Sequence, residues 1–248
     1  MLDAPKSAGV FVDFDGTLSE IVDEPEAARP VEGAIEALVA LSEVFGRVGV
    51  LSGRPLEFLQ GFFPSSVMLA GLYGLETLHE GTRTDHPLGG SWREVIDDVA
   101  SVARARGPAG MKVEAKGLSI TLHFRGRPRL EPRVRAFAEA QATRSGLECR
   151  PARMSYELHP PIPADKGSAL VELSEGLKSV CFIGDDVGDL RAFDALDKLA
   201  ASGVHSVRVA VHSLEEANEL IDRADVVVDD PDAVRDLVQY LADNTRTA

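Results

Sequence analysis

The stretch that decides the fold is Val10-Phe11-Val12-Asp13-Phe14-Asp15-Gly16-Thr17-Leu18, a short apolar run that ends in two carboxylates. Such a run, rich in β-branched and aromatic residues and stopped by a glycine, predicts a buried parallel strand. Ligands of open α/β sheets bind outside the carboxyl ends of such strands, so we expect Asp13 at the strand end and Asp15 in the following loop. There, Gly16 and Thr17 can offer backbone N–H groups and a hydroxyl to an anion. Taken alone, the stretch fits equally well two aspartates that only end a strand and cap a turn.

The composition excludes several classes of protein. The 248 residues contain no apolar run long enough to cross a bilayer, and the first residues lack the features of a signal peptide, so we expect a cytoplasmic protein. Only Cys149 and Cys181 occur, which is too few for a disulfide framework and badly spaced for zinc. The formal net charge of -14 argues against a nucleic-acid partner. A phosphate ligand would have to be bound locally, by a metal ion and a few cations. We also expect a monomer.

A parallel-sheet pattern continues after the opening stretch and is then interrupted. Apolar residues recur at helical spacing through 31–45, and short buried strands are predicted at 48–51 and 67–70. This alternation of strand and helix with short connections predicts a parallel sheet. After a predicted hairpin that ends at 82–85, the pattern stops, and it resumes only beyond 160–163.

Polar residues follow the predicted strands at several points. Ser52-Gly53-Arg54 comes directly after the strand at 48–51. Beyond the interruption, Asp165 can cap a helix that contains Lys166. A further buried strand then ends in Gly184-Asp185-Asp186-Val187-Gly188-Asp189, which adds three more carboxylates. Several strand ends therefore carry groups suited to phosphate or to a metal ion.

The interrupting segment has a different pattern, with the order helix, two strands, helix, strand. Residues 118–125 alternate strictly between apolar and polar, which is typical of a sheet with one buried face. Helices on that face would leave the other face free, and its polar residues would be Lys112, Glu114, Lys116, Thr121, His123, Arg125, Glu157 and His159. Mixed donors and acceptors suit a polyhydroxylated ligand such as a sugar. An ordinary solvated face is the alternative.

The polar strand ends resemble the four motifs of the haloacid dehalogenase superfamily of phosphohydrolases. Those motifs correspond to Asp13 and Asp15, then Ser52, then Lys166, then Asp185, Asp186 and Asp189. The resemblance covers the whole chain and implies an α/β fold, a Rossmann-like parallel sheet core formed by 1–86 and 161–248. An α/β cap domain, an antiparallel sheet with helices on one face, would be inserted at 87–160.

Within that superfamily, the chain looks most like the trehalose-6-phosphate phosphatases. The matching segments are 13–18, Ser52-Gly53-Arg54, 70–76, Glu114-Ala115-Lys116-Gly117, His123-Phe124-Arg125, Glu157 and Lys166-Gly167. The stretch 114–117, with the later histidine, arginine and glutamate, is the most specific part. Two positions depart from the family pattern: Gly188 stands where threonine is usual, and Tyr73 stands where histidine is frequent.

The resemblance implies magnesium-dependent hydrolysis of trehalose-6-phosphate to trehalose and inorganic phosphate, in trehalose biosynthesis. Asp13 would be the nucleophile that forms an aspartyl-phosphate, and Asp15 the general acid and then base. Ser52 and Lys166 would hold phosphoryl oxygens. The implied ligands of Mg²⁺ are Asp13, the Asp15 carbonyl, Asp185 and Asp189.

The resemblance also implies which residues bind the substrate. They are Gly16, Thr17, Gly53 and Arg54 near the phosphate, and Glu114, Lys116, His123, Arg125 and Glu157 in the cap, which would bind sugar hydroxyls and exclude bulk water. For Arg54, an ordinary surface role is an equal alternative. Other sugar-phosphate phosphatases, of the sucrose-phosphate or mannosylglycerate type, remain open as functions. A sugar phosphomutase and a non-catalytic sugar-phosphate sensor also remain open.

Overall fold

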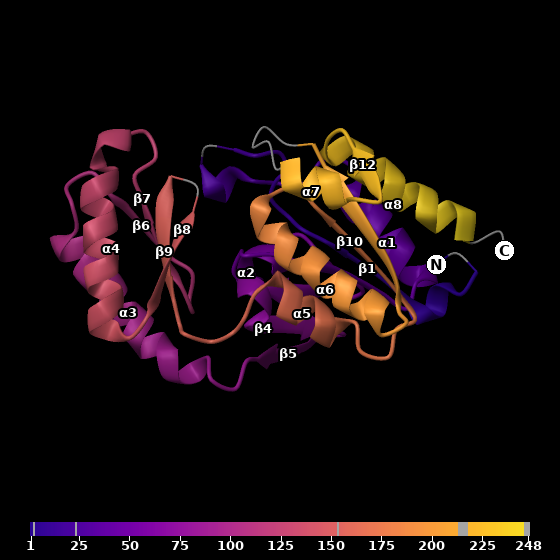
Figure 1. Ribbon diagram of the computed structural model, residues 1–248, viewed down its shortest axis with the longest axis horizontal. Helices are drawn as coiled ribbons and strands as arrows, with labels where there is room; N and C mark the ends of the chain where they lie inside the picture. Colours follow the sequence, from indigo (N-terminus) through magenta and orange to yellow (C-terminus); the bar gives the residue numbers. More distant parts are fainter. Residues whose placement is uncertain (2, 23, 153, 213–217, 246–248) are drawn as a thin grey trace. The chain divides into compact units, whose positions relative to one another are not determined.

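The computed structural model describes residues 1, 3–22, 24–152, 154–212 and 218–245. The chain divides into two compact units, Met1–Thr84 with Ala164–Ala248, and Asp85–Pro163. We call them the core unit and the cap unit and describe each by itself (Figure 1). None of the helices that the structure describes is long and apolar enough to cross a membrane.

The core unit is built on an eight-stranded sheet in the order β12-β11-β10-β1-β2-β3-β4-β5. The strands are β1 (Ala8–Val12), β2 (Arg47–Leu51), β3 (Met68–Gly71), β4 (Glu76–His79), β5 (Thr82–Asp85), β10 (Ser179–Gly184), β11 (His205–Val211) and β12 (Val226–Val228). The strands from β12 to β3 pair in parallel, and β4 runs antiparallel to β3. The predicted parallel sheet is therefore confirmed, and it ends in the predicted hairpin.

Helices cover both faces of this sheet (Figure 1). They are α1 (Ala34–Val44), α2 (Leu56–Gln60), α5 (Lys166–Leu173), α6 (Leu190–Ala201), α7 (Asn218–Arg223) and α8 (Pro231–Thr245). Side chains of β1 alternate between the two apolar clusters, because Val10 and Val12 pack with α1 and α8 while Phe11 packs with α5 and α6. Burying a side chain such as Phe11 stabilises the fold by about 1.5–3 kcal/mol. Burial on both faces is the reason that β1 is apolar at every position.

The cap unit is a four-stranded antiparallel sheet in the order β6-β7-β9-β8 with two helices. The elements are α3 (Gly90–Arg106), β6 (Lys112–Ala115), β7 (Ile120–His123), α4 (Glu131–Ser145), β8 (Glu148–Ala152) and β9 (Ser155–His159). Both helices pack against the apolar side chains of one sheet face, among them Ile120, Leu122 and Leu158. The alternation in the sequence therefore predicts correctly which face is buried.

One strand of the cap unit, β8, is absent from the order predicted from the sequence. It contains Pro151, which cannot donate a ladder hydrogen bond and so argues against a strand. In the structure β8 lies at the edge of the sheet, paired only with β9. A proline is tolerated on such an edge. The prediction of three strands is therefore wrong, and the sheet has four.

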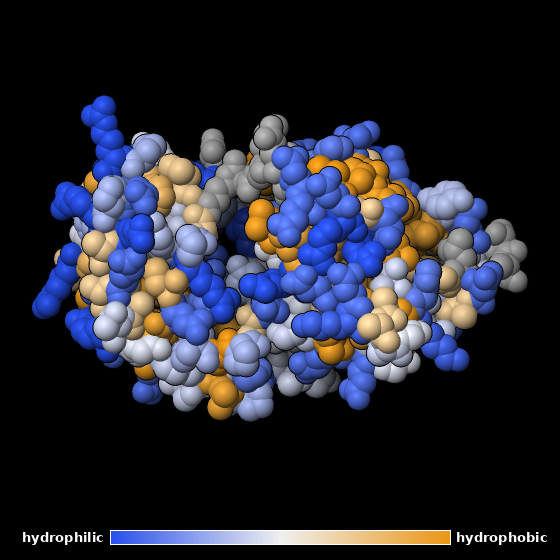
Figure 2. Space-filling view, viewed as in Figure 1, coloured by the Kyte–Doolittle hydropathy of each residue, from blue (hydrophilic) through white to orange (hydrophobic). Residues whose placement is uncertain are grey.

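Figure 2 shows hydrophilic residues over much of the visible surface, with apolar residues exposed between them. This mixture is ordinary for protein surfaces and does not by itself point to a site. The carboxyl edge of the core sheet, where buried polar residues gather, is more informative.

Candidate active site

Three neighbouring strands of the core sheet bring the sequence motifs together at their carboxyl ends. Asp13 follows β1, Ser52 follows β2 and Asp185 follows β10, and these strands lie side by side in the order β10-β1-β2. The backbones of Asp13 and Ser52 continue the hydrogen bonding between the strands. Asp13 N donates to Ile183 O at 2.9 Å, and Ser52 N donates to Ala70 O at 2.9 Å. All three side chains are buried. The sheet therefore positions them rigidly.

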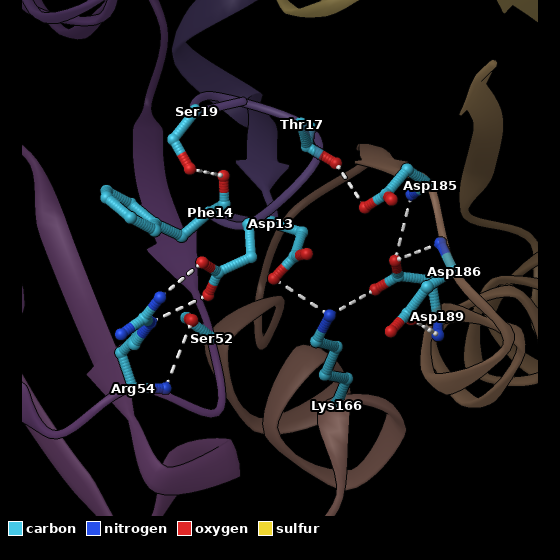
Figure 3. Close-up of polar contacts among 11 residues, drawn as sticks. Asp13, Phe14, Thr17, Ser19, Ser52, Arg54, Lys166, Asp185, Asp186 and Asp189 are labelled. Atoms are coloured by element: carbon cyan, nitrogen blue, oxygen red, sulfur yellow. Dashed lines mark hydrogen bonds and ion pairs between the residues drawn. The ribbon is translucent and has the colours of Figure 1, made fainter. Parts of the chain in front are cut away.

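Lys166 is the first residue of α5, and its side chain is buried at this edge. Asp165 caps the helix by accepting a hydrogen bond from Ser168 N at 2.8 Å. The ammonium of Lys166 lies between two carboxylates, 2.8 Å from Asp13 Oδ1 and 2.5 Å from Asp189 Oδ1 (Figure 3). Burial disfavours its charged form, but Asp13 and Asp189 outweigh this and raise the pKa of Lys166 well above its ordinary value. Lys166 is a buried cation rather than an exposed helix residue.

The loop between β10 and α6 is held by its own aspartates. Asp189 Oδ2 accepts hydrogen bonds from the backbone of Asp185 at 3.0 Å and Asp186 at 3.2 Å, while its Oδ1 faces Lys166. Asp186 Oδ1 in turn accepts from Asp189 N. Gly184 makes this possible, because a Cβ there would lie 2.4 Å from the carboxyl carbon of Asp189. Asp189 thus fixes the loop backbone through one oxygen and pairs with the Lys166 ammonium through the other.

Three buried carboxylates form a candidate metal site. Asp13, Asp185 and Asp189 each offer an oxygen, and these oxygens lie within 4.8 Å of one another. A set of carboxylate oxygens is the donor type that Mg²⁺ prefers. Gly16, with a φ of 81°, lets the loop backbone approach this cluster, since a Cβ there would lie 2.1 Å from Asp185 Oδ2. The residues present therefore fit the implied magnesium ion.

The cluster carries more negative charge than Lys166 alone offsets. Burial, together with the carboxylates of Asp189 and Asp185, raises the pKa of Asp13 well above its ordinary value despite Lys166. Burial and the neighbouring Asp189 and Asp186 raise the pKa of Asp185 to about 8. Burial also raises the pKa of Asp189 to about 6, although Lys166 opposes the rise. A divalent cation would favour the ionised form of all three.

The loop after β1 uses some of its polar groups internally. Gly16 N donates to Ser19 O at 2.8 Å, and the Thr17 hydroxyl donates to Asp185 Oδ1 at 3.1 Å. In this structure Gly16 N–H is used inside the turn and the Thr17 hydroxyl is used by Asp185; substrate binding by Gly16 and Thr17 stays a prediction. Thr17 here orients a candidate metal ligand. Asp15, by contrast, is 40% exposed and pairs with Arg54.

Tyr73 packs against the loop that follows β2. Tyr73 and its neighbour Leu72 both have positive φ, a strained conformation for residues with side chains. The Tyr73 ring lies against Gly53, where a Cβ would be only 2.7 Å from the ring. Tyr73 N donates to Ser52 O at 3.0 Å, so this loop supports the Ser52 segment directly. From the sequence, Tyr73 stands out only as a departure from the family pattern, and this contact is not predicted.

Polar side chains also gather on the helix-free face of the cap sheet. Glu114 lies opposite Thr121, and Thr121 lies opposite Glu157, so these side chains share a face. His123 Nε2 is 2.8 Å from Glu114 Oε2, and Lys116 Nζ is 4.0 Å from Glu157 Oε1. We call Glu114, Lys116, Ser119, His123 and Glu157 the cap cluster.

Ser119 is the member of the cap cluster that the sequence does not single out, and Arg125 lies just beyond β7. Ser119 donates to Glu157 Oε1 at 2.8 Å. The alternation in 118–125 places Ser119 on this face, but serine is too common on surfaces to be singled out from sequence. Arg125 follows the end of β7 and is half-buried.

Comparison with known families agrees with this geometry. The family model for trehalose-phosphatase matches residues 11–226. The chain belongs to the trehalose-phosphatase family. The resemblance stated from the motifs, and with it membership of the haloacid dehalogenase superfamily, is confirmed.

Individual relatives of this trehalose-phosphatase family member support the assignment. Trehalose-phosphate phosphatase of Mycobacterium ulcerans (strain Agy99) is 36% identical over 207 residues, which cover 79% of this chain and 53% of the relative. The chain thus spans about half the length of that curated relative.

Two solved structures share the fold. A trehalose-6-phosphate phosphatase related protein has a TM-score of 0.82 at 23% identity, covering 96% of this chain and 99% of its own. The C-terminal domain of C. albicans trehalose-6-phosphate phosphatase has a TM-score of 0.75 at 21% identity, covering 98% and 94%. At these identities the likeness is evidence for the fold alone, and it confirms the predicted α/β class.

A substitution at Asp185 tests the candidate metal site. Asp185→Asn removes a buried carboxyl group whose ionised form burial and its acidic neighbours disfavour, so we expect a metal-free melting temperature a few degrees higher, about 2–4 °C per kcal/mol for a chain of this size. The variant should also lose the rise in melting temperature that Mg²⁺ causes in the wild type. Asp186→Asn is the matched control, since it makes the same substitution in the same loop at a residue outside the cluster. A full magnesium-induced rise in Asp185→Asn would contradict the metal assignment.

The raised pKa of Asp185 predicts a pH dependence. Its ordinary pKa is 3.8 and its folded value is about 8, so the folded state binds an extra proton between these values. Metal-free stability should therefore fall as pH rises from about 4 to about 8. Because Mg²⁺ competes with that proton, the magnesium-induced rise in melting temperature should grow over the same range. Melting curves in EDTA and in Mg²⁺ measure both trends, and a magnesium effect independent of pH would count against the site.

Proposed function

We propose that this chain hydrolyses trehalose-6-phosphate to trehalose and inorganic phosphate in a magnesium-dependent reaction. The observation that carries the proposal is the buried cluster of Asp13, Lys166, Asp185 and Asp189 at the carboxyl edge of a trehalose-phosphatase-family core. Such a cluster pairs a nucleophile with the charges that a phosphate ester requires.

In the proposed mechanism the reaction is divided into two displacements. The Asp13 carboxylate attacks phosphorus and forms an aspartyl-phosphate, while Asp15 gives a proton to the departing sugar oxygen. Asp15 then takes a proton from a water molecule that attacks the phosphorus, and Asp13 is released. Bound at Asp13, the Asp15 carbonyl, Asp185 and Asp189, Mg²⁺ would offset the charge of the phosphoryl group.

The other core residues hold the phosphoryl group and the nucleophile. The Lys166 ammonium, 2.8 Å from Asp13 Oδ1, keeps the nucleophile oriented and lowers the repulsion that the phosphate meets. The Ser52 hydroxyl accepts from Arg54 N at 3.1 Å, which leaves its own proton to donate to a phosphoryl oxygen. Gly53, packed against Tyr73, allows the Ser52 turn to stay compact.

We also propose that 87–160 serves as a sugar-binding cap domain of a catalytic domain formed by 1–86 and 161–248. Glu114, Lys116 and Glu157, assisted by His123 and Arg125, would hydrogen-bond the sugar hydroxyls. The hydrogen bonds from Ser119 to Glu157 and between His123 and Glu114 support this, because polar side chains that orient one another are preorganised for a polar ligand. Both cysteines, Cys149 and Cys181, are free, which supports a reducing, cytoplasmic setting.

The substrate panel is the decisive experiment for this proposal. Purified protein with Mg²⁺ is assayed for phosphate release from trehalose-6-phosphate, sucrose-6-phosphate, a phosphorylated mannosylglycerate and hexose phosphates. We expect the highest kcat/KM with trehalose-6-phosphate. A preference for another sugar phosphate would reassign the substrate. Transfer of phosphate between sugar positions without release would indicate a mutase.

The role of Glu157 can be separated from the chemistry. Glu157→Gln keeps the shape of the side chain but weakens charge-assisted hydrogen bonds, so kcat/KM for trehalose-6-phosphate should fall about 10- to 100-fold. Turnover of p-nitrophenyl phosphate, which has no sugar, should be nearly unchanged. Glu139→Gln, an exposed glutamate on α4 paired with Arg135, is the control. Equal losses on both substrates would rule out a role in sugar selection.

A further inference from the structure

Arg54 and Asp15 form a bidentate ion pair in the core unit. Arg54 Nε donates to Asp15 Oδ2 at 2.8 Å, and Nη2 donates to Oδ1 at 2.6 Å. The flat guanidinium matches both oxygens of the carboxylate, so it fixes the rotation of the carboxylate as well as its position. Arg54 reaches this carboxylate from the loop after β2.

Arg54 is itself held by contacts that do not involve Asp15. Its Nη1 donates to Pro25 O at 2.8 Å, and its guanidinium carbon lies 4.6 Å from the centroid of the Phe58 ring. Both of its backbone polar groups are hydrogen-bonded: Arg54 N donates to Ser52 Oγ, and Arg54 O accepts from Leu72 N. The side chain is only 11% exposed. The guanidinium is therefore a fixed support, with all three nitrogens already engaged.

Asp15, by contrast, is 40% exposed and stands in a loop, so its side chain would otherwise sample several rotamers. A general acid works only within hydrogen-bond reach of the atom that it protonates. Restricting the side chain beforehand removes that entropic cost from the reaction. The ion pair meets this need in the resting state, when both carboxylate oxygens accept from the guanidinium. When Asp15 carries the proton, the protonated oxygen gives up its bond to Arg54 and turns to the substrate, while the other oxygen still accepts one hydrogen bond and keeps the carboxyl group in place.

We propose that Arg54 is a positioning residue for Asp15, and that it acts through this carboxyl group rather than on the phosphoryl group. The inference rests on the proposed phosphatase function. In the first step the bond between phosphorus and the sugar oxygen breaks, and its electron pair stays on that oxygen, which takes the proton from Asp15. The new bond joins phosphorus to Asp13. Arg54 keeps the proton donor in line with the departing oxygen.

This role predicts a dependence on the leaving group. A sugar alkoxide is a poor leaving group and needs the proton, whereas p-nitrophenolate leaves without one. The ratio kcat/KM reports the steps up to formation of the aspartyl-phosphate, so it isolates the step in which Asp15 acts as an acid. A residue that binds the phosphoryl group would affect both substrates alike.

The test compares Arg54→Lys and Arg54→Gln with the wild type. For trehalose-6-phosphate, kcat/KM should fall about 100-fold or more, while for p-nitrophenyl phosphate it should fall less than about fivefold. Inhibition by inorganic phosphate should be unchanged. The matched control is Arg29→Gln, because Arg29 also lies over a phenylalanine ring, 5.4 Å from the Phe62 centroid, and donates to backbone carbonyls. That control should keep wild-type kinetics with both substrates.

A double variant distinguishes an effect of Arg54 through Asp15 from a general structural effect of the Arg54 substitution. In the background of Asp15→Asn, which already lacks the proton donor, adding Arg54→Lys should cost little more for trehalose-6-phosphate, since both residues serve one step. Additive losses would overturn the inference. So would equal losses of kcat/KM on the two substrates together with weaker phosphate inhibition, which would place Arg54 on the phosphoryl group. A wild-type protein that turns over neither substrate would instead refute the proposed function.

Discussion

The ion pairs of Lys166 are the interaction on which the rest of the core depends. One buried ammonium bridges Asp13 and Asp189, which come from distant parts of the chain. Burying carboxylates without a counter-charge is costly, so this lysine makes the cluster tolerable in the folded state. It does not neutralise the cluster, and burial together with the carboxylates of Asp189 and Asp186 still raises the pKa of Asp185. The folded state thus holds an electrostatically unfavourable arrangement in place, which the proposed function would use to bind a cation and a phosphoryl group.

The strands that position these residues come from the first and the last parts of the chain. β1 and β2 come from the first part and β10 from the last, and they lie next to each other in the sheet. Glycines provide the close approaches that the carboxylates require, Gly16 against Asp185 and Gly184 against Asp189. The cap unit interrupts the chain between β5 and α5 without interrupting the order of the core sheet. In the proposed function, sugar selection and phosphoryl chemistry would therefore lie in different segments of the chain.

The sequence predicts the buried strands and the strand-end aspartates well, because a short apolar run that stops at polar residues is the usual pattern of a strand buried on both faces. It misses β8, an edge strand that contains Pro151 and has no apolar alternation to mark it. It also does not predict the pair between Arg54 and Asp15, which are 39 residues apart, since no local pattern tells which carboxylate a given arginine meets. The internal use of Gly16 N–H depends on the closure of one turn, which is a tertiary detail.

The central claim is that Asp13 becomes covalently phosphorylated, and trapping that intermediate tests it most directly. The wild-type protein is mixed with phosphate-labelled trehalose-6-phosphate and Mg²⁺, quenched in acid within milliseconds and digested, and the labelled peptide is identified by mass spectrometry. We expect label on Asp13 that forms and decays at the rate of turnover, and no label in Asp13→Asn. Label on another residue, or normal turnover by Asp13→Asn, would contradict the claim.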